Sequence, residues 1–92
     1  MQYNIFTVQV ATIPKLVETD SGLLTTTFFA KLLNGKKGFP YYYMKTIAYG
    51  HTCTSILDLY NQGDYVLIEA NVMTDKDTGD IILSVYKDHP IL

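Results

Sequence analysis

The sequence predicts an all-β domain in which five strands close into a small barrel, with one short helix between the third and fourth strands. Segments rich in β-branched and aromatic residues recur along the chain and alternate with turns that contain glycine. Only one segment changes from the spacing of a strand to that of a helix. With 92 residues, 48% of them hydrophobic and 17% charged, the chain can bury one core, so we expect residues 1–92 to form a single domain.

Three of the predicted strands lie in the first half of the chain. Residues 4–13 form the first strand because β-branched side chains are frequent in this segment, which ends before a proline. Residues 23–33 form the second strand after a turn rich in Thr, Asp, Ser and Gly. The dipeptide Asn34-Gly35 is a strong hairpin signal, and the third strand follows at residues 40–49.

The helix is predicted where the spacing of the apolar residues changes. Thr52 is a suitable N-cap, and Gly63 follows the expected end of the helix. The apolar residues at helical spacing are Cys53, Ile56, Leu57 and Tyr60. We therefore expect one short helix over residues 52–60.

The last two strands are predicted at residues 65–73 and 81–86, on either side of an acidic turn at residues 75–80. Residues 87–92 are expected to form only a tail. Three strands, a helix and two strands follow the order of the OB fold, a five-stranded Greek-key barrel. Closing the barrel also removes the unpaired strand edges that such a chain would otherwise expose.

The charge of the chain is unusual for a nucleic-acid-binding protein. Its net charge is −2, from seven lysines and nine acids, and it has no arginine. The acids are unevenly spread, however, and the only charged residues between Gly22 and Asp58 are Lys31, Lys36, Lys37 and Lys45. Half of the twelve Phe and Tyr residues lie between residues 28 and 43. This mixture of cations and rings is typical of a surface on which bases stack.

The third predicted strand carries the first set of candidate binding residues. Alternate residues of a strand share a face, so Tyr43, Lys45 and Tyr49 lie together. The opposite face includes the small residues Thr46 and Ala48, which suit the inside of a narrow barrel. We expect the first face to point outward and to bind nucleic acid. The alternative is that its tyrosines pack a subunit interface or cover the barrel.

Further candidates lie beside this strand. Lys36 and Lys37 occupy a glycine-flanked loop, where they could reach phosphates, and Phe39 and Tyr41 follow as additional stacking rings. Lys31, on the second strand, could continue the positively charged surface. Lysines are also common at solvated hairpin tips, and this alternative explains the same residues.

The sequence indicates neither catalysis nor a cofactor. The two histidines, His51 and His89, have no second ligand at metal spacing, and no phosphate-binding or nucleophile motif is present. Cys53 is the only cysteine, so an intramolecular disulfide is impossible and a reducing compartment is expected. No apolar run is long enough to span a bilayer. We therefore expect an intracellular protein that is not an enzyme and has no metal site.

Several motifs in order resemble the bacterial single-stranded DNA-binding proteins. The segment 43–50 is similar to their third strand, which reads aromatic-x-basic-x-aliphatic-x-aromatic. The segment 65–72 resembles their V-x-V/I-E-G-x-L strand, with Glu69 in register, and Phe28 falls where the family often has an aromatic residue. The likeness covers nearly the whole chain and suits the short, tailless members found in cyanobacteria and plastids.

The resemblance implies binding of single-stranded DNA, or secondarily RNA, without sequence preference, in replication, repair or nucleoid maintenance. It also implies a location in the cytoplasm or plastid stroma. Homodimers or homotetramers would form partly through the first strand, whose apolar residues are Ile5, Phe6, Val8 and Val10.

The chain departs from the family in three ways that matter, and the first is the replacement, near Val8, of a glycine common in the family's first strand. The tryptophan between the last two strands has no counterpart, and acids surround that turn instead. The family's Gly/Pro-rich tail with its acidic tip is also missing, so the resemblance does not extend to recruiting other proteins. The acidic balance, the absence of arginine and the missing tryptophan favour the alternative function, an OB-fold interaction or structural subunit with weak or no affinity for nucleic acid. The cationic, aromatic middle segment favours binding of single-stranded DNA.

Overall fold

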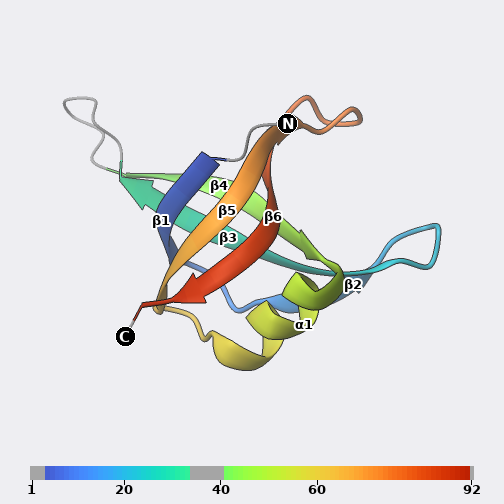
Figure 1. Cartoon of the computed structure of the whole chain (residues 1–92). Coiled ribbons are helices and arrows are strands. Elements are labelled where there is room, and N and C mark those ends of the chain that lie inside the picture. The colour runs from blue at the N-terminus through green and yellow to red at the C-terminus, as the bar shows by residue number, and fades with distance from the viewer. Residues whose placement is uncertain (1–3, 34–40, 92) are drawn as a thin grey trace.

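The computed structural model describes residues 4–33 and 41–91, which form six strands and one helix (Figure 1). The elements in chain order are β1 (Asn4–Val10), β2 (Lys15–Glu18), β3 (Leu24–Leu33), β4 (Tyr41–Tyr49), α1 (Gly50–Leu59), β5 (Tyr65–Thr74) and β6 (Ile81–Pro90). The strand order of the sheet is β1-β5-β6-β4-β3-β2, and pairing of β1 with β3 closes the barrel. No helix in these described ranges is long and apolar enough to cross a membrane.

The closure of the barrel confirms the predicted OB fold. Strand β1 pairs along most of its length with β5 and then passes to β3, where Gln9 lies opposite Lys31. Strands β4 and β6 are parallel neighbours, with Lys45 opposite Ile82, whereas the other pairs are antiparallel. This mixture of one parallel and several antiparallel pairs is what a Greek-key path through five barrel strands produces.

Strand β2 is an addition to the five predicted strands. It pairs with the first part of β3, from Lys15 opposite Thr27 to Glu18 opposite Leu24. A tight turn joins the two strands, in which Gly22 adopts a φ of +86° that favours glycine. All four residues of β2 are exposed. The segment therefore lacks the alternation of buried and exposed residues by which a strand is recognised in a sequence.

Strand β6 is longer than predicted, and the expected tail at residues 87–92 is wrong for residues 87–90. A bulge between Glu69 and Ala70 shifts the register of β5 against β6. Beyond it, Lys87 lies opposite Glu69 and Pro90 lies opposite Val66. The polar composition of residues 87–90 hides this strand in the sequence, because pairing with β5 continues past the bulge without a hydrophobic pattern to mark it.

Helix α1 begins at Gly50, and the prediction that Thr52 caps it is wrong. The N-cap residue is Tyr49, which makes no side-chain capping hydrogen bond. Thr52 instead lies within the first turn, where its buried hydroxyl donates to the Tyr86 carbonyl oxygen at 2.6 Å. The hydroxyl thus ties the helix to β6, a contact between residues too far apart in the sequence for local patterning to reveal.

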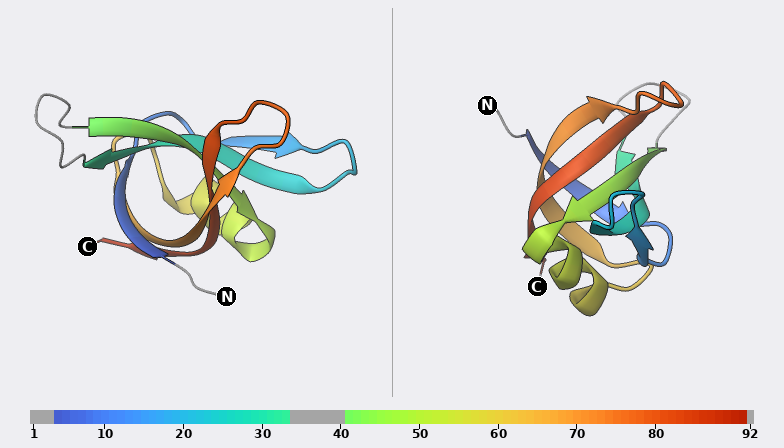
Figure 2. Two further views of the ribbon diagram at one scale, coloured as in Figure 1. Left: turned by 90° about the horizontal axis from the view of Figure 1, so that it is seen from above. Right: turned by 90° about the vertical axis from the view of Figure 1, so that its right-hand side faces the viewer.

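The core lies inside the barrel and beneath α1, which covers one end (Figure 2). Small side chains fill the narrow interior, including Ala30, Ala48 and Ala70, all fully buried. Ile56 anchors the helix in this core. Two hydroxyl groups join the helix segment to β6 by donating to the same carboxylate oxygen of Asp88. The Ser55 hydroxyl donates at 2.8 Å and the Tyr60 hydroxyl at 3.0 Å.

Candidate nucleic-acid interface

The outer face of β3 and β4 carries most of the described candidate residues. Tyr43, Lys45 and Tyr49 point outward, whereas Thr46 and Ala48 are buried in the barrel, as the alternation in the sequence predicts. Tyr43 is the most exposed of the four tyrosine rings on β4, with 59% of its surface accessible. The strand therefore presents cation and rings to solvent while its small residues satisfy the packing of the interior.

Two neighbouring rows of this face pair a cation with a ring, in opposite orders. In one row Lys31 of β3 lies opposite Tyr43 of β4, and in the next Phe29 of β3 lies opposite Lys45 of β4. Directly opposed side chains are about 5 Å apart, and successive rows of one face are separated by two residues. The two rings therefore lie on one diagonal and the two ammonium groups on the other. A polyanion crossing the face would meet a charge beside each ring.

Lys31 is held in place by a second ring. Its Nζ lies 4.1 Å from the centroid of the Tyr41 ring, a cation–π contact, and the side chain is half-buried. Because the residue opposite Lys31 is Tyr43, the lysine lies close to two tyrosines of β4. This contact keeps the ammonium group on the outer face, where a phosphate can reach it.

Tyr49 lies at the opposite end of β4 from Tyr43, next to α1. Six residues of strand separate the two rings by roughly 20 Å, since each residue advances about 3.3 Å. Tyr49 lies opposite Thr25, whose hydroxyl donates to the Val17 carbonyl oxygen of β2 at 2.9 Å. The additional strand β2 thus supports the end of the face that carries Tyr49.

A hollow of about 660 Å³ adjoins the Tyr43 end of the face. Apolar and aromatic side chains of β3, β4 and β6 line it, among them Phe29, Tyr43 and Ile82. Lys45 and two acids of the β5–β6 turn, Asp75 and Asp80, add charged groups to the lining. The Asp75 carboxylate organises the turn by accepting hydrogen bonds from the backbone N–H groups of Asp77 at 2.9 Å and Thr78 at 3.4 Å. Negative charge therefore faces Lys45 across the hollow.

Comparison with known proteins identifies the architecture. No protein-family model matches the chain, and no curated protein matches it. Among solved structures, it is similar to the single-stranded DNA-binding domain of a Synechococcus sp. protein, with a TM-score of 0.81 and 17% sequence identity. The superposition covers 97% of this chain and 94% of that chain. The chain has the fold of single-stranded DNA-binding proteins.

Two further structures share this single-stranded DNA-binding-protein fold. The second single-stranded DNA-binding protein of Mycobacterium smegmatis has a TM-score of 0.77 and 11% identity, covering 97% of this chain and 87% of that chain. The small single-stranded DNA-binding protein of Streptomyces coelicolor also has a TM-score of 0.77, with 13% identity and coverage of 99% and 93%. The resemblance seen in the sequence is thus confirmed at the level of the fold.

The structure adds Phe29 to the candidate residues. Phe28, which matches the aromatic position of the family, is buried with 2% of its surface accessible, whereas Phe29 is 45% exposed beside Lys45. The sequence could have predicted that Phe29 is exposed, because adjacent residues of a strand face opposite sides and Phe28 matches a core position. The predicted residues Lys36, Lys37 and Phe39 lie outside the described residues.

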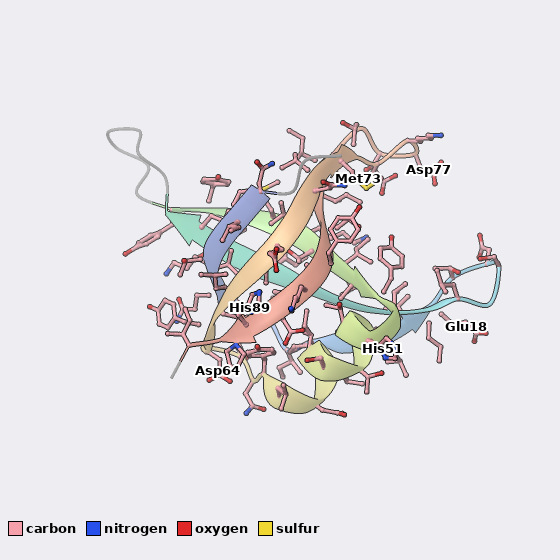
Figure 3. The ribbon with its side chains drawn as sticks, viewed as in Figure 1. Glu18, His51, Asp64, Met73, Asp77 and His89 are labelled. Carbon is pink, nitrogen blue, oxygen red and sulfur yellow. The ribbon has the colours of Figure 1, made fainter. Side chains whose placement is uncertain are left out.

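The cysteine and the two histidines lie outside strands β3 and β4. Cys53 is buried, and its Sγ lies 3.1 Å from the Thr26 hydroxyl, which also donates to the Cys53 carbonyl oxygen at 2.8 Å. The His89 Nε2 atom lies 2.8 Å from the Glu69 Oε2 atom, where β5 and β6 pair. His51 is exposed near the start of α1 (Figure 3). In the described ranges, no group of three or more His, Cys, Asp or Glu side chains could hold a metal ion.

The packing strongly changes the pKa of the Tyr60 phenol. Burial raises the pKa of its phenol well above the usual value of 10.0, and the hydrogen bond to Asp88 and the charge of that carboxylate raise it further. The phenol therefore stays protonated and remains a donor at physiological pH. Its role is structural, since it joins α1 to β6 rather than facing the candidate interface.

Proposed function

We propose that this chain binds single-stranded DNA without sequence preference through the outer face of β3 and β4. The observation that carries the proposal is the pair of rows Lys31–Tyr43 and Phe29–Lys45, in which each exposed ring has a cation as its cross-strand partner. Stacking on a ring tolerates every base because each base has a π-face, and an ammonium group beside the ring can contact the adjoining phosphate. The three similar structures support this ligand, since each is a single-stranded DNA-binding protein or the SSB domain of one.

The face acts by binding alone, without a chemical step. Tyr43 and Phe29 receive bases at one end of the face and Tyr49 at the other, while Lys31 and Lys45 neutralise phosphates. Binding releases counterions from the strand, so the affinity must fall as salt rises. With few cations and no arginine, the affinity should be weaker than that of an arginine-rich protein of this fold. Such a protein would cover exposed single strands during replication, repair or nucleoid maintenance.

The decisive experiment is titration of the protein with a thirty-nucleotide dT strand at low ionic strength, followed by tyrosine fluorescence. The proposal expects saturable binding that weakens steeply with added salt, and similar affinities for strands of different base composition. A double-stranded DNA of the same length serves as the control ligand. Absence of any binding to dT at low salt would rule out this function.

A second candidate function is that of an interaction subunit, which one surface favours. A hollow of about 470 Å³ lies between α1 and the hairpin of β2 and β3, and its walls include the exposed leucines Leu16, Leu23, Leu24 and Leu57. Exposed apolar groups of this kind are common where proteins associate. If the dT titration shows no binding, this surface becomes the better guide to function.

A further inference from the structure

A single row of outward side chains crosses four strands at the Tyr43 end of the molecule. Tyr65 of β5 lies opposite Gln9 of β1, Gln9 also lies opposite Lys31 of β3, and Lys31 lies opposite Tyr43 of β4. The row therefore runs ring, amide, cation, ring around the outside of the barrel. Its two end rings are equally open, since Tyr65 is 58% exposed and Tyr43 is 59% exposed.

Lys31 forms a wall of two separate hollows along this row. One, of about 260 Å³, includes Gln9, Lys31 and Tyr43 in its lining. The other, of about 290 Å³, includes Lys31 and the two rings of Tyr41 and Tyr65. Each hollow thus combines the same ammonium group with a tyrosine, which is the pair of groups that a nucleotide needs for its phosphate and its base.

The middle of the row is built on fixed backbone. The Gln9 side-chain amide donates to the Gly63 carbonyl oxygen at 3.0 Å. Beside it, the Gly63 N–H donates to the Val10 carbonyl oxygen at 2.7 Å, and the Val10 N–H donates to the Asp64 carbonyl oxygen at 2.8 Å. These bonds continue the pairing of β1 with β5 past Tyr65. The Tyr65 ring is therefore presented from the first residue of a well-paired strand rather than from a free loop.

The charges favour this row over the β5–β6 turn as a path for a polyanion. The hollow at the turn sets Asp75 and Asp80 against one cation, Lys45. No acidic residue of the described chain lines either hollow beside Lys31. Asp64, which precedes Tyr65, accepts a hydrogen bond from the Asn61 N–H at 2.8 Å. Asp64 and Asp77 lie at opposite ends of β5 (Figure 3).

We infer that a bound single strand leaves β4 at Tyr43, passes Lys31 and reaches Tyr65, which is a further base-stacking residue. The inference rests on the proposed function and names the path of the ligand on it. Three steps between neighbouring strands separate Tyr43 from Tyr65, roughly 14 Å measured around the barrel. Lys31 serves the phosphates on both sides of this path, and repulsion by the turn acids directs the strand away from β6.

The test compares Tyr65→Ala with Tyr65→Phe in titrations with the thirty-nucleotide dT strand at low salt. Tyr65→Ala should weaken binding roughly five- to 150-fold, the equivalent of one stacked base. Tyr65→Phe keeps a stacking ring and should bind like the wild type. Because the ring is exposed, both variants should fold, which circular dichroism and the thermal midpoint will verify.

Photo-crosslinking gives an independent readout of the path. A dT strand that carries iodouracil bases should label the peptide containing Tyr65 in the wild-type protein. Wild-type affinity of Tyr65→Ala, together with labelling confined to β4 and the β5–β6 turn, would overturn the inference while leaving the proposed function intact if Tyr43→Ala still weakens binding. Failure of the wild-type protein to bind dT would instead remove the proposed function and this inference together.

Discussion

At the scale of single residues, the exposed rings and the lysines contribute different terms to the free energy of binding. A ring contributes stacking, which depends little on salt, whereas an ammonium group contributes counterion release, which depends strongly on it. Tyr43 and Lys45 lie two residues apart on the same face of β4, but Tyr43 contributes stacking and Lys45 contributes counterion release. Substitutions at these two positions should therefore be separable by salt titration.

Replacing a ring should weaken binding without changing its salt dependence. We expect Tyr43→Ala, and likewise Tyr49→Ala, to reduce the free energy of dT binding by about 1–3 kcal/mol each. The slope of log affinity against log salt should stay at the wild-type value because no ionic contact is lost. Leu59→Ala, at an exposed residue of α1, is the matched control. If both tyrosine variants bind like this control, the choice of face is wrong.

Replacing a lysine should change the salt dependence itself. Lys45→Ala should lower the slope of log affinity against log salt by about 0.7 for each phosphate contact that is lost. Lys31→Ala should do the same and also release Tyr41 from its cation–π contact. Lys76→Ala, in the acidic turn, provides a control that removes the same charge elsewhere. An equal effect of all three substitutions would indicate nonspecific attraction rather than a defined face.

At the scale of elements, the contacts between α1 and β6 stabilise the end of the barrel. Thr52 and Tyr60 each place a hydroxyl from the helix segment on β6. We expect Thr52→Val to lower the free energy of unfolding by about 1–3 kcal/mol, because the hydrogen bond from the Thr52 hydroxyl to the Tyr86 carbonyl oxygen is lost. Thr54→Val on the same helix is exposed and should change it by less than about 0.5 kcal/mol. Chemical denaturation of the two variants makes the comparison.

The raised pKa of Tyr60 predicts a loss of stability at alkaline pH. Above pH 10 the phenol of the unfolded chain loses its proton while the folded chain retains it, so the unfolded state binds fewer protons. The free energy of unfolding should then fall by up to about 1.4 kcal/mol per pH unit, and below pH 10 this contribution is fully present. Tyr60→Phe should flatten that decline in denaturation experiments between pH 9 and pH 11. An unchanged decline would assign it to other groups.

At the scale of the whole molecule, the outer face of β1 offers a surface for assembly. Ile5 is 66% exposed there and lies opposite Glu69, whereas Val8 and Val10 point into the core. We expect light scattering at micromolar concentration to show a homodimer or homotetramer that Ile5→Lys weakens. Ile13→Lys, at an equally exposed residue outside β1, should leave the assembly unchanged. A strict monomer in the wild-type protein would contradict this prediction.

Assembly at this end of β1 is compatible with the row that ends at Tyr65. Ile5 and Gln9 occupy opposite ends of the strand, so a contact centred on Ile5 leaves the Gln9 end open. We therefore expect Ile5→Lys to lower the avidity for long dT strands but to retain the loss of affinity caused by Tyr65→Ala. Titrations of the double variant against each single variant measure this independence.

The sequence by itself determined the barrel and the two faces of β4. Alternation from Tyr43 to Tyr49 separates outward rings and cation from the buried Thr46 and Ala48, because the period of a strand is a local property. The single change of spacing after Gly50 likewise marks the only helix of the described chain. These features require no knowledge of which strands become neighbours.

Only the tertiary structure decided which residues share a row. Tyr65 and Tyr43 are brought into line by pairing through β1 and β3, and Phe29 becomes the partner of Lys45 by the register of β3 against β4. Strand β2 and the extension of β6 also depend on their neighbours, since exposed or polar segments carry no pattern of their own. The physical reason is that barrel closure and register result from pairing between distant segments, which local propensity does not determine.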